Sequence, residues 1–196
     1  MADLSRLDQQ ITFLNEADRL KSTLRATTLC DGSRFENTAE HSWHLALYAL
    51  VLADQAGPDV DLGRVIKMLI VHDLVEIDAG DTPLFGSYNA EEIAAAEAAA
   101  ADRIFGLLPE DLGENLRALW DEFEAAQTPC AQFAKSLDRF QPPMQNLASG
   151  GGSWETYNVT PDAIEKRVGP TLSQGAPGLW RYAKERIDAF FAAKAE

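Results

Sequence analysis

Apolar residues recur along most of this chain with the spacing of amphipathic helices. In residues 3–25 they return every three or four positions with charged residues between them, which is the period of a helix with one apolar face. No segment alternates apolar and polar residues like a half-buried strand, so we expect an all-α fold. This pattern and its Gly and Pro boundaries predict further helices at 37–54, 62–79, 89–106, 109–123, 133–141 and 178–195.

Two of these helices, near the middle of the chain, are apolar around nearly their whole circumference, which predicts that both are buried. The first opens at Asn37, and Glu40 three residues later completes a capping-box pattern. The second ends near Gly80 and Pro83, which interrupt a helical backbone. Pro142 should likewise stop the helix that precedes it, because proline lacks a backbone N–H donor.

The length of 196 residues, with 46% apolar and 24% charged, predicts a single domain over residues 1–196. The motifs considered below lie within residues 10–145, and residues 146–196 add a Gly-rich loop and C-terminal helices that complete the domain. Residues 146–158 lack the Gly-Lys-Ser/Thr ending of a phosphate-binding loop. We therefore interpret this segment as a flexible connection or as a lid over a pocket, with its glycines at 150–152.

The net charge of −14 argues against binding to nucleic acid or to an acidic membrane surface, because phosphate backbones require a basic footprint. A small anionic substrate is still possible, since one local Arg or Lys and a metal can hold a phosphate. The chain also shows no signal-peptide pattern and no run of transmembrane length, so we expect a cytoplasmic protein.

His72-Asp73 is the most distinctive polar pair, because it lies within the apolar run of the second central helix. An interior aspartate is expected to be paired or bound to a metal, so the pair is either a packed histidine beside a salt-bridged aspartate or part of a metal site. The only other histidines are His41 and His44. His41 begins a helix, where the helix dipole favours the neutral imidazole that binds metals. His44 is either a second ligand or a packing residue.

Three carboxylates, Glu76, Asp78 and Asp81, lie near the end of the same helix, where acidic side chains oppose the helix dipole. A solvated acidic helix end would look the same, but such conflicts with local preference are expected at functional sites. Glu76 is four residues beyond His72 and three beyond Asp73, so we expect all three on one helix face.

Two further features allow a structural or a functional interpretation. Asp138 lies between apolar residues and either forms a salt bridge with a neighbouring Lys or Arg or acts as a ligand. Lys21 and Arg25 are four residues apart and share a helix face, which is either solvated or, in a chain this acidic, a site for an anion.

The residues above fall in five short motifs: Leu20-Lys21-x-x-Leu24-Arg25, Glu36-Asn37-x-Ala39-Glu40-His41-Ser42, His72-Asp73-x-x-Glu76, Gly80-Asp81-x-Pro83 and Leu137-Asp138. In order and spacing, these motifs resemble the HD-domain metal-dependent phosphohydrolases, and in particular their 5′-deoxynucleotidase-like branch. The resemblance implies a helical HD-domain fold with a buried metal site between central helices, and commonly a homodimer.

The resemblance also implies roles for individual residues. Mn, Co, Fe, Ni or Zn would suit a set of two imidazoles and two carboxylates better than Ca or Mg, which prefer oxygen ligands. Glu76 would orient or deprotonate the attacking water, and Asp81 would act near the sugar or leaving group. Arg25, assisted by Lys21, would bind the phosphate, and the substrate would also contact Asp73, Asp81 and Asp138. The implied metal ligands are His41, His72, Asp73 and Asp138.

The expected activity is release of phosphate from nucleoside or deoxynucleoside 5′-monophosphates through a metal-activated water. Characterised deoxynucleotidases have a tryptophan directly after the arginine, whereas this chain has Ala26, so base and sugar preference stay open. The alternatives are hydrolysis of a cyclic or polyphosphorylated nucleotide, or a regulatory module that binds metal and nucleotide without turnover. Glu76 and Asp81 favour an enzyme, because a binding module has no need of a water-activating carboxylate.

Overall fold

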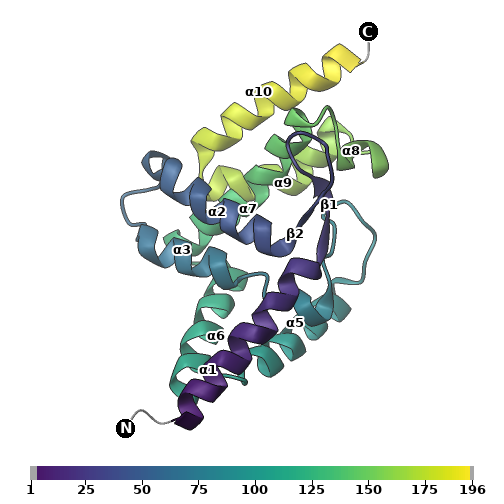
Figure 1. The fold of residues 1–196 in the computed structure, drawn as a ribbon. Helices are drawn as coiled ribbons and strands as arrows, with labels where there is room; N and C mark the ends of the chain where they lie inside the picture. Colours follow the sequence, from purple (N-terminus) through teal and green to yellow (C-terminus); the bar gives the residue numbers. More distant parts are fainter. Residues whose placement is uncertain (1–3, 195–196) are drawn as a thin grey trace.

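The computed structural model describes residues 4–194, and most of them are helical (Figure 1), which confirms the all-α expectation. Two strands, β1 (Leu24–Thr28) and β2 (Phe35–Asn37), form a small antiparallel sheet. Short 3-10 helices, η1 (Asp18–Ser22) and η2 (Ala53–Gln55), join longer elements. The α-helices are α1 (Leu4–Ala17), α2 (Thr38–Val51), α3 (Leu62–Val71), α4 (Glu76–Ala79), α5 (Ala90–Phe105), α6 (Glu110–Ala125), α7 (Pro129–Ala148), α8 (Ser153–Thr156), α9 (Pro161–Gly175) and α10 (Pro177–Lys194).

Helices α2, α3 and α7 occupy the middle of the molecule, with α1, α5 and α6 towards one end and α8, α9 and α10 towards the other (Figure 1). Helix α7 packs against α2, α3, α6, α9 and α10. The buried apolar side chains form one cluster that extends from Phe13 of α1 to Ile187 of α10. Burial of this surface is the main contribution to the stability of such a fold.

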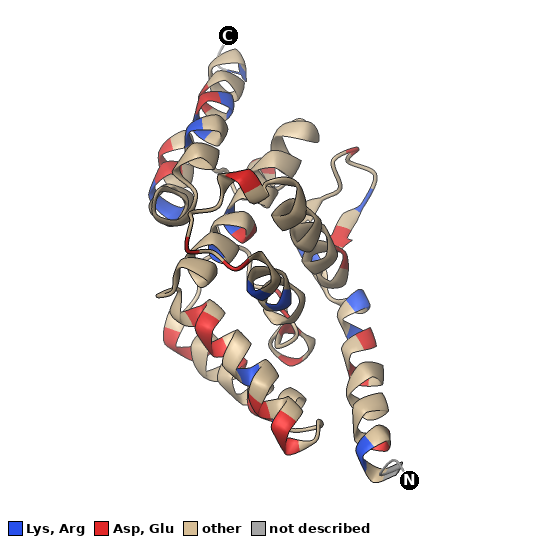
Figure 2. Cartoon of the chain, turned by 90° about the vertical axis from the view of Figure 1, so that its left-hand side faces the viewer, with Lys and Arg blue, Asp and Glu red and all other residues tan. Residues whose placement is uncertain are grey.

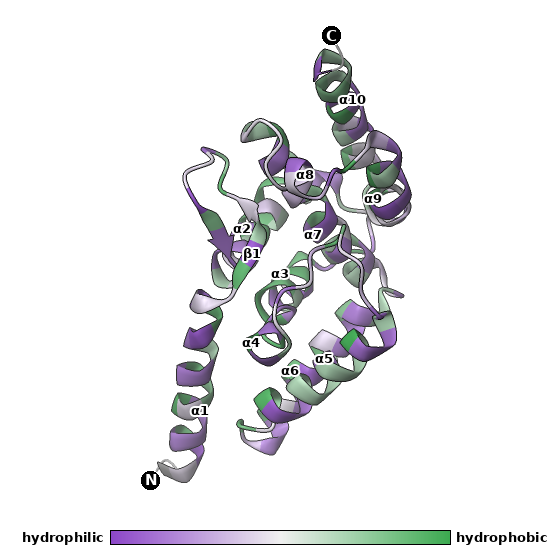
Figure 3. Cartoon of the chain, turned by 90° about the vertical axis from the view of Figure 1, so that its right-hand side faces the viewer, coloured by the Kyte–Doolittle hydropathy of each residue, from purple (hydrophilic) through white to green (hydrophobic). Residues whose placement is uncertain are grey.

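Helix α1 is shorter and more exposed than its sequence pattern predicts. It ends at Ala17, and residues up to Ser22 continue as the 3-10 helix η1. Although hydrophobic and hydrophilic residues alternate along α1 (Figure 3), Leu7, Ile11 and Leu14 are exposed. The helix packs against η1 and α5, and its Arg6 donates two hydrogen bonds to Asp111 of α6, but most of its apolar face is exposed.

The β1–β2 sheet was not predicted, because its strands are too short to show an alternating pattern. Leu24 pairs with Asn37 and Thr28 with Phe35, which brings Arg25 beside Glu36. Helix α2 begins directly after β2 and has the predicted capping box: the Asn37 side chain accepts from the backbone N–H of Glu40, and the Glu40 carboxylate accepts from that of Asn37.

Near Pro142 and His72, the helix boundaries also differ from the prediction. Pro142 and Pro143 lie inside α7, which continues to Ala148, because packing against the surrounding helices outweighs the lost hydrogen bonds. Helix α3 ends at Val71, and His72–Val75 form a turn before α4, so His72 and Glu76 do not share one regular helix. Gly80 ends α4 as predicted, with φ of 77° that favours glycine.

Acidic residues outnumber Lys and Arg in the chain, and the excess is clearest along α5 and α6 (Figure 2). Among the described residues, none of the helices is long and apolar enough to cross a membrane.

Candidate metal centre

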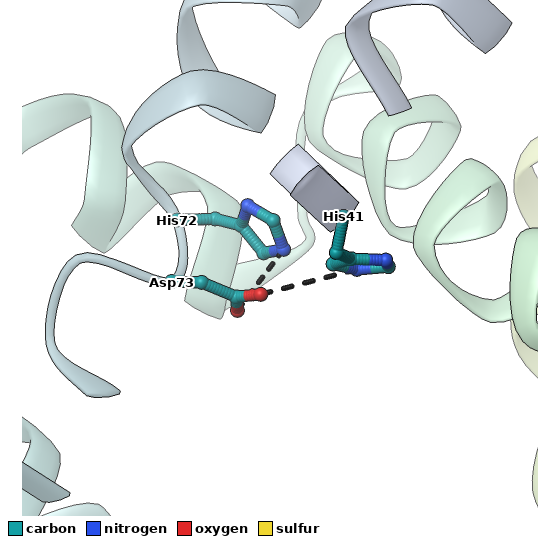
Figure 4. Close-up of side chains that lie close together, drawn as sticks. All are labelled: His41, His72 and Asp73. Atoms are coloured by element: carbon teal, nitrogen blue, oxygen red, sulfur yellow. Dashed lines mark ion pairs between the residues drawn. The ribbon is translucent and has the colours of Figure 1, made fainter. Parts of the chain in front are cut away.

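Three side chains from two separate segments converge in the interior (Figure 4): His41 from the first turn of α2, and His72 and Asp73 from the turn after α3. One nitrogen or oxygen atom of each lies within 4.8 Å of the others. Asp73 Oδ1 is 3.0 Å from His72 Nε2, and Asp73 Oδ2 is 3.9 Å from His41 Nε2. Two imidazole nitrogens and a carboxylate at these separations can bind one ion.

Asp138 of α7 also lies close to both histidines of this group. Its Oδ1 is 3.0 Å from His41 Nε2 and 3.9 Å from His72 Nε2. Its Oδ2 is 3.5 Å from the guanidinium of Arg139. Oδ2 therefore forms the expected salt bridge, while Oδ1 faces the histidines, where a metal ligand would lie. Burial raises the pKa of Asp138, but Arg139 and the two histidines outweigh it and hold the pKa well below its usual range.

The ring of His72 is oriented for metal binding by its own helix. Its Nδ1 lies 3.0 Å from the backbone oxygen of Leu69, which can only accept, so Nδ1 carries the proton. The other nitrogen, Nε2, is buried and forms no hydrogen bond among the described residues, although Asp73 Oδ1 lies 3.0 Å away. With the proton on Nδ1, Nε2 and this carboxylate oxygen are both acceptors. A buried lone pair without a partner is unfavourable, and a bound cation would satisfy it. The donor set therefore fits a divalent transition metal.

His41 is fully buried and held from both sides. Nε2 faces Asp138, and Nδ1 lies 3.1 Å from Gln141 Oε1. Burial and the charge of Arg25 lower the pKa of His41, but the contacts with Asp138 and Glu36 outweigh them and raise it. The helix dipole alone would favour the neutral ring of His41, but the surrounding carboxylates favour the protonated ring. A metal would therefore have to displace the proton on Nε2 that faces Asp138.

Arg25 of β1 is the cation closest to this group, and its side chain is only 12% exposed. One guanidinium nitrogen, Nη1, lies 3.2 Å from Asp73 Oδ2 and 3.4 Å from Asp81 Oδ1, and Nε is 3.7 Å from Glu36 Oε2. Burial lowers the pKa of Arg25, but the charges of Asp73, Asp81, Glu76 and Asp138 outweigh it and raise the pKa above its usual value. The structure does not bring Lys21 to the cluster: its side chain is 67% exposed and forms an ion pair with Asp18.

Glu76 and Asp81 lie on the same side of the cluster as Arg25. The hydroxyl of Thr38 donates to Glu76 Oε2 over 2.9 Å. Burial and the nearby Asp73 raise the pKa of Glu76 to about 9, so it can hold a proton at neutral pH. Burial also raises the pKa of Asp81, which accepts a hydrogen bond from the backbone N–H of Ala26. The third acid, Asp78, instead forms an ion pair with Arg103 of α5.

A cavity of about 70 Å³ opens beside these groups. It can hold a phosphoryl-sized group, whereas drug-sized ligands occupy pockets of about 300–1,000 Å³. The segment after the Gly-rich turn contributes to its wall, although Trp154 of α8 is itself buried against Phe190 and Phe191. Residues on its wall include Arg25, Ala26, Asp81, Phe85, Asp138, Arg139, Trp154 and Tyr157.

Sequence reasoning did not identify the polar residues behind His41. Glu36 belongs to the motif that also contains His41, but the sequence did not indicate that it is buried. Strand β2 places its carboxylate against α7, where it is 1% exposed. Gln141 and Gln145 are also buried, at 0% and 1% exposure, and their spacing of one helical turn was the available signal. His44 is half-buried, has a pKa lowered by burial, and lies 3.3 Å from Gln141 Nε2, as expected for a packing residue.

Comparison with known proteins identifies the family. The model of the HD domain matches residues 17–180. A crystal structure from Magnetospirillum magnetotacticum, named "predicted metal-dependent phosphohydrolase", is 44% identical, superposes with a TM-score of 0.88 and covers 96% of both chains. The chain therefore belongs to the HD domain family.

Two relatives of the chain are named as 5′-deoxynucleotidases. The 5′-deoxynucleotidase HDDC2 of Homo sapiens is 33% identical over 106 residues, which is 54% of this chain and 50% of that protein. The 5′-deoxynucleotidase hdd1 of Schizosaccharomyces pombe is 31% identical over 136 residues, or 67% of each chain. The chain thus spans about half the length of the human relative that it matches.

Proposed function

We propose that this protein is a metal-dependent phosphohydrolase that releases phosphate from nucleoside or deoxynucleoside 5′-monophosphates. The observation that carries the proposal is that Asp73 contacts both the candidate metal centre and the buried Arg25. Its Oδ1 faces His72 Nε2, and its Oδ2 lies 3.2 Å from the guanidinium of Arg25. A cation site and a buried arginine are thereby adjacent, as hydrolysis of a phosphate ester requires. The activity named for the curated relatives supports a nucleotide as the substrate.

In this proposal a divalent transition metal (Mn, Co, Fe, Ni or Zn) is held by His41, His72, Asp73 and Asp138. When bound, the ion supplies a Lewis acid that polarises the phosphoryl group and lowers the pKa of water. Asp73 and Asp138 would then lie close enough to the phosphate to contact it as well.

The remaining residues of the site position the substrate and move the proton. Arg25 exchanges its contacts with Asp73 and Asp81 for phosphate oxygens, which a guanidinium binds in a planar, charge-assisted manner. Without a metal, Glu76 holds a proton at neutral pH, and a bound cation would favour its ionised form. The ionised carboxylate, oriented by the hydroxyl of Thr38, would then orient the attacking water and take its proton. Asp81 acts near the sugar or the leaving oxygen. A contribution from Lys21 would require its side chain to leave Asp18.

The position of Arg139 favours one alternative substrate, a polyphosphorylated nucleotide. It lines the same cavity as Arg25, and a second cation there would suit a substrate with a second phosphate. Hydrolysis of a polyphosphorylated nucleotide is therefore the second candidate function.

The proposal is tested by measuring phosphate release from a panel of nucleoside and deoxynucleoside 5′-monophosphates. Chelated protein would be resupplied separately with Mn, Co, Ni, Zn and Mg. We expect metal-dependent release from at least one monophosphate, and the panel would show the preference that accompanies Ala26. No release, with metal still bound, would favour first the polyphosphorylated substrates and then a binding module without turnover.

We include in the proposal a homodimer, which the family resemblance suggests, and the cytoplasmic location expected from the sequence. Light scattering coupled to gel filtration measures the mass in solution, and a value near 21.5 kDa would contradict the dimer. Cell fractionation tests the compartment.

A further inference from the structure

A buried polar network lies on the Nδ1 side of the His41 ring. It consists of the carboxylate of Glu36 from β2 and the amides of Gln141 and Gln145 from α7, each at most 1% exposed. Glu36 Oε1 accepts hydrogen bonds from both amides, over 3.1 Å from Gln141 and 2.7 Å from Gln145. Polar groups this deeply buried are costly unless paired, and these two hydrogen bonds offset part of that cost.

The hydrogen bonds of Gln141 have a fixed direction. A carboxylate accepts hydrogen bonds and donates none, so the amide nitrogen of Gln141 must face Glu36. The same nitrogen lies 3.3 Å from His44 Nδ1. The carbonyl oxygen of Gln141 is therefore turned towards His41, where it lies 3.1 Å from Nδ1.

This direction determines where His41 carries its proton. A carbonyl oxygen only accepts, and a second acceptor, Glu36 Oε2, lies 3.5 Å from the same nitrogen. Nδ1 of His41 is therefore protonated, and it keeps this proton when a cation replaces the proton on Nε2. The nitrogen that is left to bind a metal is Nε2, and this is the atom that faces Asp73 and Asp138. Hydrogen bonds of this kind fix the tautomer and ring orientation of a metal-binding histidine and increase its basicity.

We propose that Glu36 and Gln141 are positioning residues that set the metal-binding tautomer of His41. Glu36 orients the amide of Gln141, and Gln141 holds the proton on Nδ1 so that Nε2 is directed at the ion. The proposal rests on the metal site of the proposed function, but it concerns metal affinity and needs no turnover.

The test compares Gln141→Met with Gln145→Met in the full-length protein. Each variant removes one amide donor to Glu36 from α7, but only Gln141→Met also removes the nearer acceptor of His41 Nδ1, which leaves Glu36 Oε2 at 3.5 Å. In a chelator competition, the zinc dissociation constant should rise ~10–100-fold for Gln141→Met and stay within about threefold of the wild type for Gln145→Met. Circular dichroism and thermal melting establish that both variants fold.

An equal loss of zinc affinity in both variants, or none in Gln141→Met, overturns the proposal. The first result would mean that the network contributes only to packing, and the second that the tautomer is set without Gln141. If wild-type protein binds zinc but hydrolyses no monophosphate, only the proposed function fails. If it binds no zinc, both fail.

Nuclear magnetic resonance of the imidazoles provides a readout that requires neither a variant nor activity. The chain has three histidines, so the zinc-loaded wild-type protein with isotope-labelled histidine gives few signals. We expect zinc on Nε2 of His41 and a slowly exchanging proton on Nδ1. Zinc on Nδ1, or rapid exchange of that proton with water, would overturn the proposal even if Gln141→Met failed to fold.

Discussion

Nε2 of His41 lies 3.0 Å from Oδ1 of Asp138, although 97 residues separate them in the chain. The contact exists because α2 and α7 pack against each other and place a buried imidazole opposite a buried carboxylate. The same oxygen is 3.9 Å from His72 Nε2, so Asp138 faces both histidines of the candidate metal centre.

We therefore expect Asp138→Ala to release the metal. Removing a direct ligand should weaken binding by more than the ~10–100-fold typical of residues that only support a ligand. Elemental analysis after gel filtration measures the metal content, with Asp59→Ala, in an exposed loop, as the control. Unchanged metal content would leave Asp138 as the partner of Arg139 and nothing more.

Glu76→Ala should keep the metal and lose turnover. General base catalysis contributes ~10²–10⁴-fold to a rate, so kcat should fall by that factor, while the metal content should not change. Asp78→Ala is a matched control, because Asp78 is in the same short helix but pairs with Arg103. Normal activity in Glu76→Ala would remove Glu76 from the mechanism.

Arg25→Ala should raise KM for a monophosphate by ~10–100-fold, because a hydrogen bond to a charged group contributes about 1.5–3 kcal/mol. Lys21→Ala separates the two cations that share the sequence motif. Since Lys21 is exposed and paired with Asp18, we expect a much smaller effect on KM in steady-state kinetics. A loss in Lys21→Ala as large as that in Arg25→Ala would mean that Lys21 reaches the phosphate.

The pH dependence of stability should report the burial of Glu76. Its pKa is about 9 in the folded chain, against 4.5 for the ordinary group, so between these values the folded state holds a proton that the unfolded state has lost. Stability from this group therefore falls as pH rises from about 4.5 to 9. Asp81, whose pKa is also raised, acts in the same direction.

In chelator-treated protein, we expect Glu76→Gln to melt at a higher temperature than the wild type at pH 8, with a smaller difference at pH 5. A gain of about 1 kcal/mol would correspond to roughly 2–4 °C for a chain of this size. Glu91→Gln, in the exposed first turn of α5, should leave the pH profile unchanged. Parallel melting profiles for Glu76→Gln and wild type would show that Glu76 is ionised in the folded protein.

Much of the architecture follows from local patterns. The period of apolar residues predicted most of the helices but not α8 or α9. Asn37 and Glu40 predicted the start of α2, and Gly80 predicted the end of α4. These features depend on side chains a few residues apart, and the physical preferences that produce them act at that range. Local preference failed at Pro142, which packing keeps inside α7.

The candidate site divides in the same way. The sequence by itself determined which residue types were available: three histidines, an interior aspartate beside one of them, and an arginine in an acidic chain. Only the tertiary structure decided that Asp138 faces His41, that Arg25 rather than Lys21 reaches Asp73, and that Glu36 lies behind His41. Those contacts join α2, α7 and a short sheet across long separations, and burial and packing of whole elements, rather than any local pattern, bring them together.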